Sequence, residues 1–214
     1  MTKTDKSFNT SNIFGKIRKK LAHSRDVNSS SSDAPKFSST TNIGEQSLAP
    51  YYSADLTNVL FLSKRGMSRA PLAREVMRSL LHLSDHFGSI RPSARGISGA
   101  YEFCPFDKRM VHTALKFGYE LSGNSRRVNM AELSSANLII TLDQESEEYA
   151  KSRKFYIRGQ VRPIGMFLPA GESPFIADPF ERGESSDANS TYHDIIRSVE
   201  YGCGKVLKFI PSIV

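Results

Sequence analysis

Short apolar runs alternate with amphipathic stretches from residue 57 onward. Two runs, 58–62 (NVLFL) and 137–142 (NLIITL), are almost wholly apolar, which is typical of strands buried on both faces of a parallel sheet. A further strand is predicted over 160–166. Helical spacing of apolar residues predicts helices over 71–83, 108–117 and 191–210. Alternating strands and helices predict a single α/β domain in three layers, a central parallel sheet flanked by helices.

Individual residues set the expected helix limits. Pro71 suits the first helical position, where its missing amide hydrogen costs nothing. The apolar face of this helix is predicted to run to Leu83. Gly118 is expected to end the second helix, and the last helix is expected to turn Ile195, Ile196, Val199 and Val206 inward.

Residues 1–56 differ in composition from the domain predicted over 57–214. They are rich in Ser, Thr and Asn, and their sparse apolar residues cannot offset the ordering entropy, so we predict a disordered tail. Within it, residues 12–25 combine apolar positions at helical spacing with basic ones. That pattern indicates either a helix that docks on an anionic membrane or an acidic partner, or a solvated, partly helical tail, which we favour.

Charge and composition exclude several classes of protein. The chain has 214 residues and a net charge of +7, from 29 basic and 22 acidic residues. The excess is divided between tail and domain, so we expect no nucleic-acid partner. No apolar run approaches the roughly 18 residues of a membrane span, and no secretory leader is evident. Two cysteines are too few for a disulfide framework, so we expect a cytoplasmic protein.

The segment 63–71 (SKRGMSRAP) joins the first predicted strand to a helix. Such a connection points backbone N–H groups at one spot beside the positive end of the helix dipole, where a phosphate-like dianion can bind. The Arg69 guanidinium could form a bidentate contact with two oxygens of that dianion. A simpler interpretation is a tight connection with Ser68 as helix cap. The candidate phosphate-binding residues are Ser63, Lys64, Arg65, Gly66, Met67, Ser68 and Arg69.

The surrounding sequence resembles the low-molecular-weight protein tyrosine phosphatases. Residues 58–75 (NVLFLSKRGMSRAPLARE) match the family's strand, Cys-x5-Arg-Ser-Pro loop and following helix, and 177–180 (ADPF) is similar to its Asp-Pro-aromatic loop. Weaker similarities follow in the family's order, and together they cover residues 57–210. They lie at 93–97, 105–109, 138–143 and 200–203.

The resemblance implies a two-step hydrolysis of phosphate monoesters without metal or cofactor. In the family a thiolate attacks phosphorus, the loop amides and Arg stabilise charge, and an aspartic acid protonates the leaving group. Carried over, Arg69 is the loop arginine, Asp178 the general acid and Phe180 an aromatic wall for the substrate. A turn aspartate before Pro179 is the alternative for Asp178. The implied partner is a phosphotyrosine protein or a small phosphate ester.

The chain departs from the family at the nucleophile, where Ser63 replaces cysteine. A serine hydroxyl needs an adjacent general base, whereas a cysteine is readily ionised. The histidines that could approach it in space are His82, His86, His112 and His193. Ala70 also replaces a hydroxyl residue, and Arg65 replaces a glycine. Either Ser63 is a laboratory exchange, or the chain is a natural pseudophosphatase, which we favour because several departures affect one chemical step.

The leading hypothesis is therefore a homologue that binds phosphate or phosphotyrosine with impaired catalysis. The alternatives are an active phosphomonoesterase and a scaffold with a vestigial site. Asp143, at the end of a predicted strand, is interpreted either as part of the site rim or as a cap of the next turn. Cys104 and Cys203 are interpreted as small, partly buried side chains.

Overall fold

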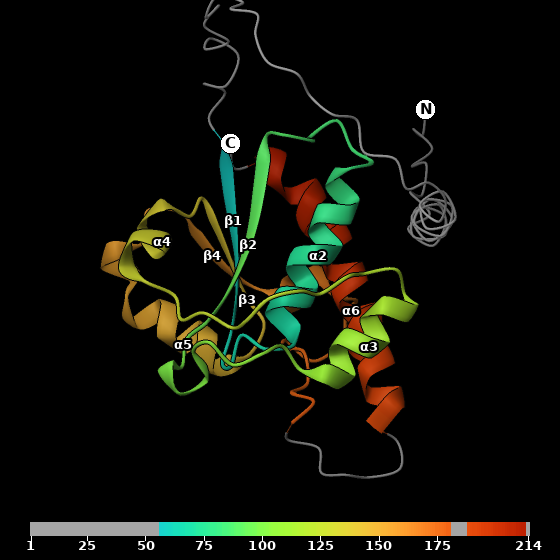
Figure 1. The fold of residues 1–214 in the computed structure, drawn as a ribbon. Helices are drawn as coiled ribbons and strands as arrows, with labels where there is room; N and C mark the ends of the chain where they lie inside the picture. Colours follow the sequence, from blue (N-terminus) through green and yellow to red (C-terminus); the bar gives the residue numbers. More distant parts are fainter. Residues whose placement is uncertain (1–55, 181–187, 213–214) are drawn as a thin grey trace, which may run out of the picture.

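The computed structural model describes residues 56–180 and 188–212, which form a sheet with helices on both faces (Figure 1). The predicted tail lies outside the described residues, apart from Leu56. The strands are β1 (Thr57–Ser63), β2 (Ile90–Gly96), β3 (Leu138–Thr141) and β4 (Gln160–Pro163). The α-helices are α2 (Arg69–Leu81), α3 (Lys108–Lys116), α4 (Met130–Ser135), α5 (Gln144–Ser152) and α6 (Ala188–Phe209). Short 3-10 helices are η1 (Gly99–Tyr101), η2 (Lys154–Tyr156), η3 (Ile164–Phe167) and η4 (Ile210–Ser212).

The sheet is parallel throughout, with strand order β2-β1-β3-β4. β1 is therefore central, between β2 and β3. Its last residue, Ser63, pairs with Gly96 at the end of β2, and Leu62 pairs with Thr141 at the end of β3. Because parallel strands end at the same edge of a sheet, the segments that follow these three strands lie together there.

Helices α2, α3 and α6 cover one face of the sheet, and α4 and α5 cover the other (Figure 1). Side chains of β1 alternate between the two cores: Val59 and Phe61 pack with α2 and α6, whereas Leu60 and Leu62 pack with Ile139 and the α4 side. This double burial explains why the strand is apolar at every position, and it confirms the predicted three-layer α/β fold.

Two predicted limits were wrong. Helix α2 begins at Arg69, so Pro71 is its third residue, and it ends at Leu81, which leaves Leu83 41% exposed beyond the helix. The strand predicted over 160–166 ends at Pro163, after which the chain turns into η3. Proline lacks the amide hydrogen that a continuing strand would use.

The last two predicted helices are confirmed. Gly118 follows α3 with φ +89°, the left-handed conformation that commonly ends a helix. The four residues of α6 that were expected to face inward are all buried. The edge strand β2, the helices α4 and α5 and the short 3-10 helices were not predicted. Within the described residues, no helix is long and apolar enough to cross a membrane.

Candidate functional site

A five-residue loop, Lys64–Ser68, connects the end of β1 to the first turn of α2. Ser63 is 2% exposed, and its Oγ accepts a hydrogen bond from the Gly66 amide at 3.2 Å. The amides of Arg65, Met67 and Ser68 have no acceptor within the part of the chain that the structure describes. Unused amides beside a helix N-terminus are suited to binding an anion.

Two glycines allow this loop to lie directly against β2. Gly66 has φ +69°, and a Cβ at that position would come within 2.5 Å of the Gly96 nitrogen. A Cβ at Gly96 would in turn lie 2.7 Å from the Arg65 carbonyl oxygen. Ser125 holds the same carbonyl by donating a hydrogen bond from Oγ at 2.7 Å. The loop conformation therefore depends on glycine at both positions.

The far end of the loop is held by Asp107. The Asp107 amide donates to the Met67 carbonyl at 3.0 Å, and the Asp107 carboxylate accepts from Ser68 Oγ at 3.5 Å and from the Tyr192 hydroxyl at 2.8 Å. Burial, together with the bond to this carboxylate, raises the pKa of Tyr192. Ser68 stands at the N-cap position of α2 but its side chain makes no capping bond, so its interpretation as a helix cap was wrong.

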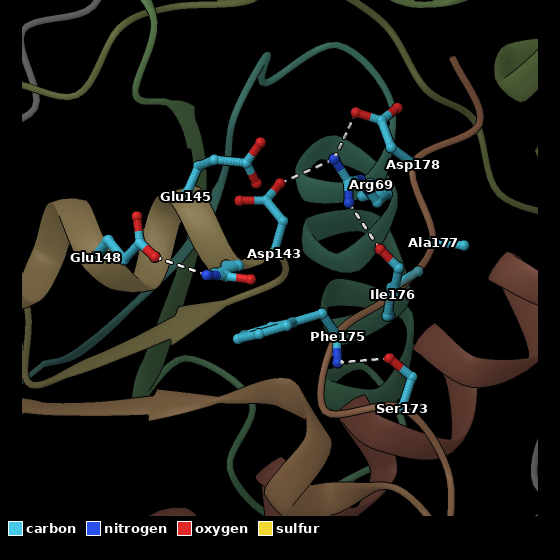
Figure 2. A pocket seen from close by; sticks show the side chains of 10 residues that line it. Arg69, Asp143, Glu145, Glu148, Ser173, Phe175, Ile176, Ala177 and Asp178 are labelled. Carbon is cyan, nitrogen blue, oxygen red and sulfur yellow. Dashed lines mark hydrogen bonds and ion pairs between the residues drawn. The ribbon is translucent and has the colours of Figure 1, made fainter. Parts of the chain in front are cut away.

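The guanidinium of Arg69 is almost fully buried and contacts three protein acceptors (Figure 2). Nη1 donates to the Ile176 carbonyl at 2.7 Å, and Nη2 lies 3.0 Å from Asp178 Oδ2 and 2.8 Å from Asp143 Oδ2. The structure thus brings together Arg69 and Asp178, the two residues matched to the family's arginine and acid. Asp143 was interpreted as a residue of either the site rim or a helix cap, and Ile176 was not among the predicted site residues.

Asp143 both caps a helix and holds the site. Its Oδ1 accepts from the Ser146 amide at 2.9 Å in a capping box at the start of α5. Its Oδ2 accepts from the Lys64 amide at 2.8 Å, in addition to pairing with Arg69. Both interpretations of this residue are therefore correct. The signal for the cap was present in the sequence, as an aspartate followed by serine three residues later.

Lys64 extends toward α5 and pairs with Glu145, with Nζ 2.6 Å from Oε1. This hydrogen bond from Lys64 is the main cause that lowers the pKa of the Glu145 carboxyl. Both side chains are more than a third exposed, so solvent screens the pair and its contribution to stability is small.

Asp178 also contacts Arg65 and Phe180. Its Oδ1 accepts from the Phe180 amide at 3.0 Å and lies 3.4 Å from Arg65 Nη1. The Arg65 guanidinium lies over the Phe180 ring, 4.6 Å from its centroid, and over the Tyr101 ring at 5.4 Å. Both oxygens of Asp178 act as acceptors in this arrangement. Tyr101 was not predicted to belong to the site.

A cavity of about 460 Å³ opens beside Arg69, between α5 and the segment that carries Asp178 (Figure 2). Its walls carry four carboxyl groups and one guanidinium. They are formed by Arg69, Asp143, Gln144, Glu145, Glu148, Ser173, Phe175, Ile176, Ala177 and Asp178. Within the described residues, no group of three His, Cys, Asp or Glu side chains could hold a metal ion.

Among the described residues, no histidine forms a hydrogen bond with Ser63 Oγ, so none is placed as its base. Gly66 is the one hydrogen-bond partner of Ser63 Oγ in the described ranges. His82 follows the C-terminus of α2, roughly 20 Å along that helix from the loop, and stacks on Phe87. His193 packs against Phe117.

The remaining residues of interest are structural. Cys203 is fully buried with Sγ 3.7 Å from the Ala73 carbonyl, and burial raises the pKa of its thiol. Cys104 is half-buried. Ala70, which stands where the family has a hydroxyl residue, is also fully buried.

Comparison with known proteins agrees with this geometry. The family model for low molecular weight phosphotyrosine protein phosphatase matches residues 58–212. A protein tyrosine phosphatase from Entamoeba histolytica is similar in structure, with TM-score 0.66 and 18% identity over 73% of this chain and 97% of that chain. YfkJ from Bacillus subtilis is similar with TM-score 0.66 and 20% identity over 75% of this chain and 98% of that chain. A Drosophila arginine phosphatase is similar with TM-score 0.61 and 16% identity over 71% of this chain and 96% of that chain.

No curated protein sequence matches the chain significantly. The solved structures share its fold at low identity, whereas the family model spans the whole described domain from β1 to η4. This chain belongs to the low molecular weight phosphotyrosine protein phosphatase family.

Proposed function

We propose that this protein binds phosphate or a phosphate ester, such as phosphotyrosine, in the Ser63–Arg69 loop, and that its catalysis is impaired. The observation that carries the proposal is the environment of Ser63. Its hydroxyl stands at the nucleophile position, yet its one hydrogen-bond partner among the described residues is the Gly66 amide, which donates to it. Within the part of the chain that the structure describes, no side chain accepts a hydrogen bond from this hydroxyl, and an un-ionised serine is a weak nucleophile.

The features that suit the loop to anion binding are present. The amides of Arg65, Met67 and Ser68 lack acceptors among the described residues, and α2 begins at the loop with the positive end of its dipole. Arg69 contacts Asp143, Asp178 and a carbonyl, so a bound phosphate would share or replace these acceptors. Loss of the nucleophile with retention of the loop is the pattern of a pseudophosphatase.

The specific observation that favours an active enzyme instead is Asp178. It lies beside Arg69, where an acid for the leaving group is needed, and is 7% exposed. A phosphomonoesterase would then rely on Ser63 with a base recruited on substrate binding. The relatives named above include tyrosine and arginine phosphatases, so either type of phosphorylated residue is a reasonable class of ligand to test.

Turnover of an aryl phosphate separates the two functions. The variants are Ser63→Cys, Ser63→Ala as the inert control, and Ser63→Cys combined with Ala70→Ser, which restores the hydroxyl found in relatives. The unaltered protein should hydrolyse no faster than Ser63→Ala, and the cysteine variants should exceed both by on the order of tenfold or more. Turnover by the unaltered protein clearly above Ser63→Ala would establish the active enzyme instead.

Binding is measured separately, by thermal unfolding with inorganic phosphate. A ligand at 100 times its dissociation constant stabilises the folded state by about 2.7 kcal/mol, which is a shift of several degrees for a domain of this size. If phosphate at tens of millimolar leaves the melting temperature unchanged, the proposed binding function is wrong.

A further inference from the structure

The side chain of Arg65 occupies the space between two aromatic rings at the mouth of the loop. We call this space the aromatic slot; Tyr101 and Phe180 are its walls. The guanidinium carbon lies 5.4 Å from one ring centroid and 4.6 Å from the other. Arg65 Nε is buried and has no hydrogen-bond partner within the described residues, and Nη1 makes only a long 3.4 Å contact with Asp178.

The aromatic slot adjoins Asp178, the carboxyl that would protonate the organic leaving group of a phosphate ester. With phosphorus in the loop, the ester oxygen has to face Asp178 if that carboxyl is to reach it. The organic group therefore leaves the loop past Asp178, whose Oδ1 contacts Arg65 and the Phe180 amide. A phenyl ring would stack on Phe180, but the guanidinium already stacks there.

An aryl group and an anionic group would meet Arg65 very differently. A phenyl ring has to displace the guanidinium, exchanging two cation–π contacts for ring stacking of similar strength. It would also remove a positive charge from beside Asp178. A carboxylate or second phosphate would instead accept charge-assisted hydrogen bonds from Nε and the terminal nitrogens, which are the strongest class of protein hydrogen bond.

The surroundings of the aromatic slot add positive charge. Arg127 is exposed and lies against Gly99, in the same short helix η1 as Tyr101, with Nη1 3.6 Å from the position of a Cβ at that glycine. Phe180 is 42% exposed, so the slot opens to solvent and a ligand can enter without moving the core.

We propose that Arg65 fills the aromatic slot and makes the loop selective for a non-aromatic phosphate ester that carries a second negative charge. This inference rests on the proposed function, since it concerns a ligand whose phosphate is held by the Ser63–Arg69 loop. It makes Arg65 a specificity-determining residue that disfavours aryl phosphates and, by charge repulsion, phosphorylated guanidines.

The test measures dissociation constants calorimetrically for three probes: inorganic phosphate, phenylphosphonate and phosphonoacetate. The variants are Arg65→Ala, which empties the aromatic slot, and Arg65→Gln, which keeps most of the bulk but removes the charge. Arg153→Ala is the matched control. It removes the same charge and a guanidinium that lies 3.6 Å from the Tyr149 ring centroid, outside the site.

In the unaltered protein and in Arg153→Ala, phosphonoacetate should bind about tenfold tighter than phenylphosphonate. Arg65→Gln should lose this advantage because it weakens phosphonoacetate more than phenylphosphonate. Arg65→Ala should reverse the order, because phenylphosphonate gains the emptied slot. Both variants lose the positive charge of Arg65, so inorganic phosphate should weaken to a similar extent in each, and the comparison uses the ratio of the two phosphonates.

Each outcome decides a separate point. If phosphate binds but the two phosphonates keep the same ratio in all four proteins, Arg65 does not set specificity and the inference is wrong while the anion site stands. If phosphate binds neither the unaltered protein nor any variant, the proposed function fails and this inference fails with it. A tighter aryl ligand in the unaltered protein also overturns it.

Discussion

Replacing Arg69 with methionine tests how the site is held together. The side chains of Arg69, Asp143 and Asp178 are 4%, 6% and 4% exposed, and Nη2 of the arginine lies within 3.0 Å of both carboxylates. Methionine retains much of the apolar stem but leaves two buried carboxylates without their shared cation. Breaking a buried ion pair by removal of one partner costs about 3–5 kcal/mol. For a domain of this size, that is a fall in melting temperature of roughly 6–20 °C.

The assay is urea unfolding at pH 7 of Arg69→Met, made in the unaltered protein and in a background that carries Asp143→Asn and Asp178→Asn. Asparagine removes the stranded charges, so the free energy of unfolding lost through Arg69→Met should be smaller in the asparagine background. Arg158→Met is the control, because Arg158 is exposed and should cost less than about 0.5 kcal/mol.

Two results would refute this reasoning. If Arg69→Met loses less than about 1 kcal/mol at pH 7, the carboxylates are not dependent on the arginine. If the loss is equally large in both backgrounds, it arises from packing and not from unpaired charge. Denaturant slopes that match the reference are needed for either comparison to hold.

Three further predictions concern other parts of the domain. Gly66→Ala should lower the free energy of unfolding by about 2–4 kcal/mol in denaturant titrations, because its Cβ would meet a β2 backbone nitrogen at 2.5 Å; an unchanged midpoint would contradict that contact. Tyr119→Phe should cost about 1.5–3 kcal/mol by the same measure, since the buried hydroxyl donates to Glu200 at 2.7 Å, and a neutral effect would mean that another donor replaces it. Burial raises the pKa of Cys203, so at pH 8 a thiol reagent should modify Cys104 alone in the native protein and both cysteines in denaturant, as counted spectrophotometrically.

The strand β1 could be predicted from the sequence because it is buried on both faces and its residues are therefore consecutively apolar. The edge strand β2 could not. Its residues, IRPSARG, include two arginines and a proline, and it forms because its backbone pairs residue by residue with Thr57–Ser63. Tertiary pairing of this kind overrides local propensity and leaves little trace in a single sequence.

The candidate site shows the same division. The loop and Asp178 could be predicted because they belong to short family patterns. The contact of Lys64 with Asp143, and that of Arg65 with Tyr101, could not, because they join segments that only the folded sheet brings together. Asp143 was left between two interpretations since a single carboxylate serves both, with one oxygen on a helix N-terminus and the other on the loop.

The conformation of the Ser63–Arg69 loop therefore depends on residues outside the loop. The Lys64 amide is held by a carboxylate 79 positions away, the Arg65 carbonyl by a serine 60 positions away and Arg69 by an aspartate 109 positions away. If β1, the loop and α2 were transplanted into another scaffold, the sequence motif would be present, but the residues that hold its conformation would be missing. The short signature therefore forms an anion site only when the rest of the domain supplies these distant contacts.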